Sequence, residues 1–208
     1  MIGSEEEGRD FVADRCGTKA LAQLSELLGE LAEENARQNL VARATLESGW
    51  QRHIADSAQL LDHVPRETSG PWIDLGSGAG FPGLVIAIMR PDLTVRLVES
   101  RKRRIEWLAR MKAQFSLENC RIDGSRLELV ESFPASVISA RAFAPLPKLL
   151  SLSARFSTKH SKWVLPKGRS AAQEVAELPR KWRKMFHVEQ SRTDPEAGII
   201  VGTGRVES

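Results

Sequence analysis

From residue 72 onward, the sequence alternates between short strand-like runs and longer helix-like runs, and this alternation restricts the possible folds more than any other feature. The strand-like runs are rich in Val, Ile and Leu, whereas the runs between them place apolar residues at helical spacing. Strands that alternate with helices in this way form a parallel sheet with right-handed crossover connections. The predicted strands are 72–76, 94–100, 120–125, 136–142 and 162–168, and the predicted helices are 83–90, 101–115, 146–156 and 170–178.

The end of the chain breaks this alternation. Two strand-like runs, 185–192 and 198–205, are joined by turn residues at 193–198, which leave no room for a helix. Such a connection predicts a hairpin, whose strands are antiparallel. We therefore predict an α/β fold with a Rossmann-like sheet of seven strands, mostly parallel, with an antiparallel last strand.

The beginning of the chain has a helical pattern. Leucines at spacings of three and four predict an amphipathic helix over 18–35, and a second helical stretch is expected over 47–61. Turn-forming residues then interrupt the chain at Pro65, Ser69, Gly70 and Pro71. We therefore expect an N-terminal helical extension over 1–70 and a core over 71–208.

A glycine-rich turn follows the first predicted strand. Gly76, Gly78 and Gly80 permit backbone angles and a close approach that side chains would prevent, so a flat ligand can lie against the turn. With Gly83, the last two of these glycines also match the GxGxxG pattern of dinucleotide enzymes, which by itself is weak evidence. The turn therefore indicates a ligand site without identifying the ligand.

Two carboxylates beside the turn favour one ligand. Asp74 ends the first strand, where an acid favours the cationic S-adenosylmethionine over the pyrophosphate of a nicotinamide cofactor. Glu99 ends the second strand, at the edge where doubly wound sheets bind ligands, and its carboxylate can accept hydrogen bonds from both ribose hydroxyls. We predict S-adenosylmethionine as the cofactor, with a nicotinamide cofactor and a purely structural turn as the alternatives.

Charge is distributed unevenly along the chain, although the formal net charge is only +3. Residues 1–34 carry nine acids and three bases, whereas 101–126 carry eight bases and three acids. Residues 155–192 carry ten bases and three acids. The basic segments are either an ordinary solvated surface or a binding surface for a polyanion.

The sequence predicts a cytoplasmic protein without a membrane anchor. Its longest apolar run, 84–89, is far shorter than the roughly 20 residues of a membrane-spanning helix, and Glu5, Glu6 and Glu7 exclude a signal peptide. Cys16 and Cys120 have neither the spacing of a metal site nor that of a disulfide framework. We therefore expect no metal, and we expect the protein to be a monomer.

Four further motifs accompany the glycine-rich turn LGSGAGFPG at 75–83. They are NL at 39–40, RHIADS at 52–57, SARAF at 139–143 and KG at 167–168. In their order and spacing, over about residues 35–170, they resemble the bacterial 16S ribosomal RNA guanine nitrogen-7 methyltransferases, also called glucose-inhibited division protein B. The chain departs from this family at Ala140 and Ser136, where the family usually has Ser and Asp.

The resemblance implies a class I methyltransferase fold and a set of cofactor contacts, namely Gly76, Phe81, Leu127, Glu128 and Arg141. It also implies 16S ribosomal RNA, or the small ribosomal subunit, as the partner, with a loop near the decoding centre as the substrate. Leu127 and Glu128 also follow the third strand, where backbone groups can bind an adenine edge. The alternative is that Glu128 only caps a short helix.

Five residues of these motifs are candidates for RNA contact: Asn39, Arg52, His53, Arg141 and Lys167. Arg141 and Lys167 lie at the carboxyl ends of predicted strands, where side chains converge on the ligand crevice. Arg52 and His53 could equally be a structural pair on a surface helix.

The implied reaction needs no catalytic acid or base, because guanine nitrogen 7 already has a free lone pair. We therefore assign no catalytic residue. The chain lacks the Asn-Pro dipeptide of amine methylation and the Pro-Cys nucleophile of cytosine carbon methylation. The remaining alternatives are a nicotinamide-dependent oxidoreductase and a non-catalytic RNA-binding module that retains a relic cofactor fold.

Overall fold

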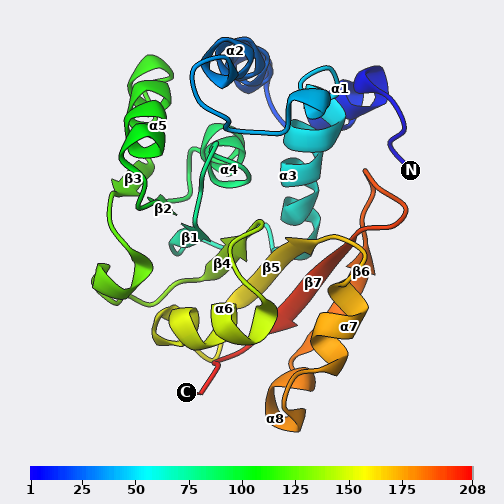
Figure 1. The fold of residues 1–208 in the computed structure, drawn as a ribbon, viewed down its shortest axis with the longest axis vertical. Helices are drawn as coiled ribbons and strands as arrows, with labels where there is room; N and C mark the ends of the chain where they lie inside the picture. The colour runs from blue at the N-terminus through cyan, green and yellow to red at the C-terminus, as the bar shows by residue number, and fades with distance from the viewer. Residues whose placement is uncertain (208) are drawn as a thin grey trace.

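The computed structural model describes residues 1–207 and contains one seven-stranded sheet with the strand order β3-β2-β1-β4-β5-β7-β6. Strands β1 to β5 run parallel, and β7 runs antiparallel to both of its neighbours, β5 and β6 (Figure 1). The predicted fold class is therefore confirmed, including the hairpin at the end of the chain. The strands are β1 Trp72–Leu75, β2 Val95–Val98, β3 Cys120–Asp123, β4 Val137–Ala140, β5 Lys162–Lys167, β6 Phe186–Gln190 and β7 Gly198–Thr203.

Helices cover both faces of the sheet (Figure 1). On one face lie α1 Glu5–Ala13, α2 Thr18–Asn35, α3 Asp56–Ala58, α4 Gly83–Met89 and α5 Lys102–Gln114. On the other face lie α6 Leu146–Ser153, α7 Ala171–Ala176 and α8 Arg180–Arg183. The short helices α1 and α8 are not among the predicted elements, whereas the predicted helix over 18–35 is confirmed as α2.

The helical stretch predicted over 47–61 lies somewhat later and is irregular. It consists of a π-helix at Trp50–Ala55, the single turn α3 and a 3-10 helix at Gln59–His63. The Glu5 carboxylate accepts hydrogen bonds from the backbone N–H groups of Trp50, at 3.0 Å, and Gln51, at 2.8 Å. A contact with α1 therefore fixes the start of this stretch.

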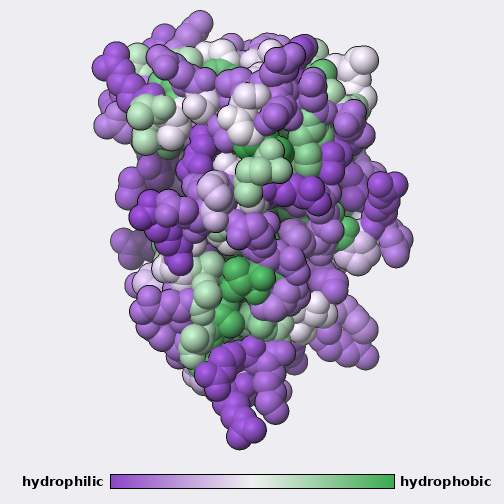
Figure 2. Space-filling model, turned by 90° about the vertical axis from the view of Figure 1, so that its right-hand side faces the viewer, coloured by the Kyte–Doolittle hydropathy of each residue, from purple (hydrophilic) through white to green (hydrophobic). Residues whose placement is uncertain are grey.

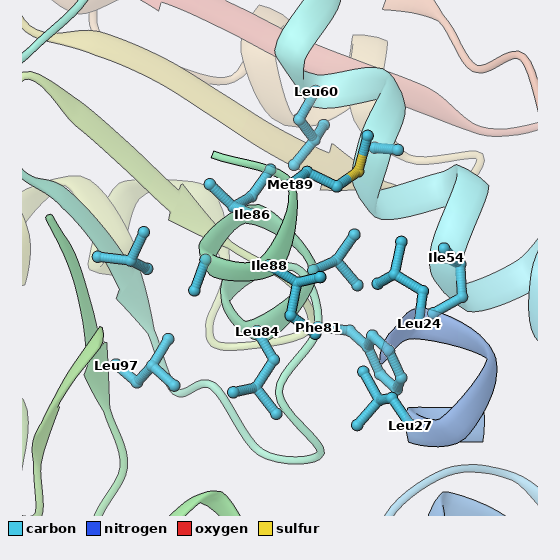
Figure 3. Packing of buried hydrophobic residues seen from close by; sticks show 14 of the residues in the cluster. Leu24, Leu27, Ile54, Leu60, Phe81, Leu84, Ile86, Ile88, Met89 and Leu97 are labelled. Carbon is cyan, nitrogen blue, oxygen red and sulfur yellow. The ribbon is translucent and has the colours of Figure 1, made fainter. Parts of the chain in front are cut away.

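The N-terminal helices and the sheet share one hydrophobic cluster. Leu24 and Leu27 of α2 are fully buried and pack with Phe81 and with α4 (Figure 3). Every residue of α4 is buried, because this helix lies between the sheet and the N-terminal helices. The division at residue 70 remains a prediction, and the packing is continuous across it.

The surface of the molecule is mainly polar. On the face shown in Figure 2, hydrophilic residues cover most of the area and hydrophobic residues form small separate areas. Within residues 1–207, no helix combines the length and the apolar character that crossing a membrane would require.

Candidate cofactor and substrate sites

The glycine-rich turn connects β1 to α4 and has the backbone conformation that its glycines suggest. Gly76, Gly78 and Gly80 have φ values of +66°, +58° and +98°, which side chains rarely adopt. A Cβ atom at Gly80 would overlap the Leu84 side chain, whereas a Cβ atom at Gly78 would lie 3.5 Å from its nearest neighbour, Arg104 Nη1. The protein itself therefore requires Gly80, whereas a Cβ atom at Gly78 would make only ordinary contacts with its neighbours.

Asp74 stabilises this turn through hydrogen bonds of its buried carboxylate. Its carboxylate is fully buried and accepts hydrogen bonds from Ser139 Oγ at 2.8 Å and from the backbone N–H of Gly83 at 3.2 Å. Burial raises the pKa of Asp74 from 3.8 to about 6, against the opposing effect of these hydrogen bonds. Asp74 thus joins β1, β4 and the start of α4, and its direct contact with a cofactor remains a prediction.

Glu99 lies directly after β2 and stabilises the turn through a hydrogen bond with its backbone. One carboxylate oxygen accepts a hydrogen bond from the Gly78 backbone N–H at 3.0 Å, and the other accepts bonds from Ser100 and Arg101, both at 2.8 Å. These three bonds fix the orientation of the carboxylate. Because an ionised carboxylate has about four acceptor positions, Glu99 retains capacity for a hydroxyl group.

Glu99 faces a first cavity of about 190 Å³ at the carboxyl ends of β1, β2 and β4. Of the predicted cofactor contacts, this cavity brings together Gly76, Glu99 and Leu127. The Glu128 side chain is exposed and does not line the cavity. The complete lining is Gly76, Val98, Glu99, Ser100, Arg101, Arg104, Ser125, Leu127, Ala142 and Phe143.

A second cavity of about 370 Å³ lies beside the first, and Ala142 lines both. It brings together four of the five predicted RNA contacts, Arg52, His53, Arg141 and Lys167. The fifth, Asn39, is exposed and lies outside it. The other lining residues are Thr45, Asp56, Pro166, Gly168, Ser191, Asp194, Ala197, Gly198 and Ile199.

The three cations of the second cavity are each paired with a carboxylate. Arg52 lies 2.8 Å from Asp194, and Arg141 lies 3.6 Å from Asp56. Lys167 lies 2.8 Å from a carboxylate oxygen of Glu174 in α7. The pairing leaves little uncompensated positive charge in the cavity.

These three carboxylates, Asp56, Asp194 and Glu174, are not among the site residues predicted from the sequence. Asp56 belongs to the motif RHIADS, so it could have been selected from the sequence. Asp194 lies in the turn of the final hairpin, 142 residues from its partner Arg52, and no local pattern indicates their contact. Glu174 lies in α7 and is likewise visible in the sequence only as a charged helical residue.

His53 lines the second cavity in a neutral form. Its ring stacks on Phe81 with the ring centres 5.0 Å apart, and only 5% of the residue is exposed. Burial, together with the positive charges of Arg141 and Arg52, lowers the pKa of His53 from 6.5 to about 3. The Thr45 hydroxyl donates to the Ala42 carbonyl, so it accepts from His53 Nε2, and Nδ1 carries no proton.

The family of the chain follows from comparison with known proteins. Residues 20–196 match the family model GidB, rRNA small subunit methyltransferase G. The chain is 61% identical to the ribosomal RNA small subunit methyltransferase G of Erythrobacter litoralis over 208 residues, which is 100% of both chains. It is also 58% identical to the protein of the same name from Novosphingobium aromaticivorans, over 88% of this chain and 80% of that protein.

Solved structures share the fold at low sequence identity. A SAM dependent methyltransferase from Aquifex aeolicus has a TM-score of 0.55 at 13% identity, over 76% of this chain and 93% of that chain. M. jannaschii TYW2, solved in complex with AdoMet, has a TM-score of 0.57 at 12% identity, over 82% of this chain and 80% of that chain. The fold is therefore that of class I methyltransferases, and on the sequence match the chain belongs to the GidB family of rRNA small subunit methyltransferase G.

Proposed function

We propose that the protein transfers a methyl group from S-adenosylmethionine to nitrogen 7 of a guanine in 16S ribosomal RNA of the small ribosomal subunit. The observation that carries this proposal is the pair of neighbouring cavities, which share Ala142 as a common wall. Two reactants held in these cavities would meet at that residue. Such a substrate would also place the protein in the cytoplasm.

The first cavity has the features that S-adenosylmethionine requires. Gly76 of the turn lines it without a side chain of its own, and the fixed Glu99 carboxylate can accept hydrogen bonds from ribose hydroxyls. Bound there, the cofactor supplies an electrophilic methyl group on a sulfonium ion. Family membership favours this cofactor over the nicotinamide alternative.

The first cavity is smaller than the roughly 300 Å³ at which pockets for drug-sized ligands begin. Phe143 lines it and packs against Gly76. We therefore propose that Phe143 moves away from Gly76 when the cofactor binds.

The second cavity suits the methylation of a ring nitrogen. Positive charge develops on guanine as the methyl group arrives, so an unpaired cation beside nitrogen 7 would oppose the reaction. His53 is neutral, and Arg52, Arg141 and Lys167 are each paired with a carboxylate. These residues therefore align the base without raising the activation barrier of methyl transfer. Alignment of the two reactants alone can lower that barrier by about 7 to 11 kcal/mol.

A test of the proposed function combines product analysis with a pH profile. We expect mass spectrometry of methylated ribosomal RNA to show 7-methylguanosine, which carries a fixed positive charge. At saturating cofactor and RNA, the rate should be nearly flat from about pH 7 to 8.5, because no protein base has to ionise. The lower limit is set by the pKa of Asp74, which is raised to about 6.

A product methylated on a ribose hydroxyl, a cytosine carbon or an exocyclic amine would contradict the proposal. RNA with 7-deazaguanosine at the modified position is the matched control. This base lacks nitrogen 7, so it should accept no methyl group.

We also expect RNA affinity to fall steeply with added salt, because basic side chains displace counterions from the RNA. The logarithmic slope is about −0.7 per phosphate contacted for a single strand. Arg180→Glu, in the exposed helix α8, should weaken binding and make the slope shallower. The control Lys19→Glu makes the same charge change at an exposed position of α2 and should have little effect. An affinity that does not change with salt would show that the basic segments are an ordinary solvated surface.

A further inference from the structure

The second cavity contains the carboxylate of Asp56, and one oxygen of this carboxylate is not fully used in contacts within the protein. The Asp56 side chain is 21% exposed and lines the cavity. Its oxygen Oδ1 accepts hydrogen bonds from Thr193 Oγ1 at 2.7 Å and from Gln59 Nε2 at 2.9 Å. Within residues 1–207, its other oxygen, Oδ2, has only Arg141 as a partner, at 3.6 Å. One oxygen is thus fixed by the fold, and the other retains free acceptor capacity.

The ion-pair partner of Asp56 lies next to the wall that the two cavities share. Arg141, its partner across the cavity, directly precedes Ala142, the residue that lines both cavities. The Arg141 guanidinium also lies over the Phe81 ring, 5.1 Å from the ring centre. Asp56 Oδ2 therefore lies 3.6 Å from the side chain of the residue that precedes the shared wall at Ala142.

Guanine presents two different sets of groups to a protein. Nitrogen 7 and O6 are acceptors on one edge, whereas N1–H and the N2 amino group are donors on the Watson–Crick edge. A base whose nitrogen 7 faces the first cavity places its donors within the second. A carboxylate accepts hydrogen bonds and donates none, so it matches these donors.

The same carboxylate would favour guanine over adenine and would assist the reaction. Adenine also has a nitrogen 7, but its N1 is an acceptor, and a carboxylate opposite this atom is repelled. As the methyl group reaches nitrogen 7, the base becomes positively charged, and a nearby negative charge stabilises that state.

We propose that Asp56 is the residue that selects guanine, with its Oδ2 atom accepting hydrogen bonds from the N1–H and N2–H groups of the target base. This inference rests on the proposed function. Asp194, the other carboxylate of this cavity, differs in that both oxygens already have close partners: Arg52 at 2.8 Å and the Glu196 backbone N–H at 2.9 Å.

The experiment pairs a change in the protein with a change in the base. The methylated guanosine is first mapped with the wild-type enzyme, and RNA carrying inosine at that position is then prepared by ligation. Inosine keeps nitrogen 7, O6 and N1–H but lacks the N2 amino group. We expect inosine to lower the wild-type kcat/KM by about 10-fold or more, as expected for loss of a hydrogen bond to a charged group.

Asp56→Asn should lower kcat/KM for guanosine by a similar factor, and inosine should then cause little further loss. Such non-additivity identifies two groups that interact. The matched variant Asp194→Asn should retain the full inosine penalty. Melting temperature and cofactor affinity, measured for both variants, separate a folding defect from a defect in base recognition.

Three results would overturn the inference: equal wild-type rates on inosine and guanosine, an undiminished inosine penalty in Asp56→Asn, or loss of that penalty in Asp194→Asn instead. The first comparison needs no variant, so it holds even if Asp56→Asn fails to fold. Methylation of RNA containing 7-deazaguanosine would instead refute the proposed function itself, so the two failures are distinguishable.

Discussion

Replacing Gly78 with valine is expected to weaken S-adenosylmethionine binding by about 100-fold or more, to below the limit of calorimetric detection. The Cβ atom of a side chain at this position would lie 3.5 Å from Arg104 Nη1, and Arg104 lines the first cavity, so a branched side chain would extend toward the cofactor site. The φ of +58° adds strain of roughly 1 to 2 kcal/mol for a residue other than glycine. We therefore expect a moderate loss of stability and a protein that remains folded.

Two further variants complete this test. Gly78→Asn fills the same space with a residue that tolerates positive φ, and it should lose cofactor binding with less strain. Gly80→Ala places its Cβ atom against Leu84, inside the protein, so it should mainly lower the melting temperature. Circular dichroism and calorimetry on the same samples distinguish these effects. Wild-type cofactor affinity in both Gly78 variants would mean that the turn has only a structural role.

The second large effect is a loss of stability in acid that depends on His53. The pKa of this histidine is about 3 in the folded protein, against 6.5 for an ordinary histidine, mainly because the ring is buried. Below pH 6.5 the unfolded chain binds a proton that the folded chain does not. The stabilisation is therefore complete above about pH 6.5 and is lost as the pH falls toward about 3. Between pH 7 and 5, it falls by about 2 kcal/mol.

Denaturant unfolding at pH 7 and pH 5 measures this loss. His53→Gln cannot take up a proton, and its amide can still donate to Thr45, so it should lose about 2 kcal/mol less than the wild type over this interval. His63, whose pKa is also lowered by burial, provides the control. His63→Gln should change the pH dependence in the same direction but by a smaller amount.

The contribution of Asp74 to stability changes with pH in the opposite direction over part of this pH interval. Because its pKa is raised from 3.8 to about 6, the stability that it contributes is complete below about pH 3.8 and is lost as the pH rises through about 6. Wild type and His53→Gln share this effect, so the difference between them isolates His53. Equal losses in both proteins would show that His53 is protonated in the folded state.

The sequence predicted the parts of the fold that depend on local patterns. The alternation from residue 72 onward and the final hairpin are found in the sheet, because apolar spacing and turn residues act over short distances. Helix α1 had a local signal as well, since Ser4 caps it by accepting from the Glu7 backbone N–H at 3.1 Å. Ser4 followed by three glutamates is typical of the start of a helix.

The site residues that directly follow strands could be predicted from the sequence. The contacts between segments that are distant in the sequence could not. Gly76, Glu99 and Leu127 line one cavity because parallel strands bring their carboxyl ends to the same edge. The ion pair between Arg52 and Asp194 joins residues 142 positions apart, and Asp56 contacts Thr193 across 137 positions. Such contacts depend on how the hairpin packs against the N-terminal residues, which the sequence pattern does not contain.

The walls of the second cavity come from widely separated stretches of chain, and this affects when the cavity can form during synthesis. Thr45 is the first lining residue to be made and Ile199 is the last. A growing chain folds from its N-terminus as it leaves the ribosome. Until the hairpin containing Asp194 emerges, Arg52 lacks its partner and the cavity lacks one side. A nascent chain of this protein would therefore be unable to enclose a base of the ribosomal RNA around it until the segment up to Ile199 has been made.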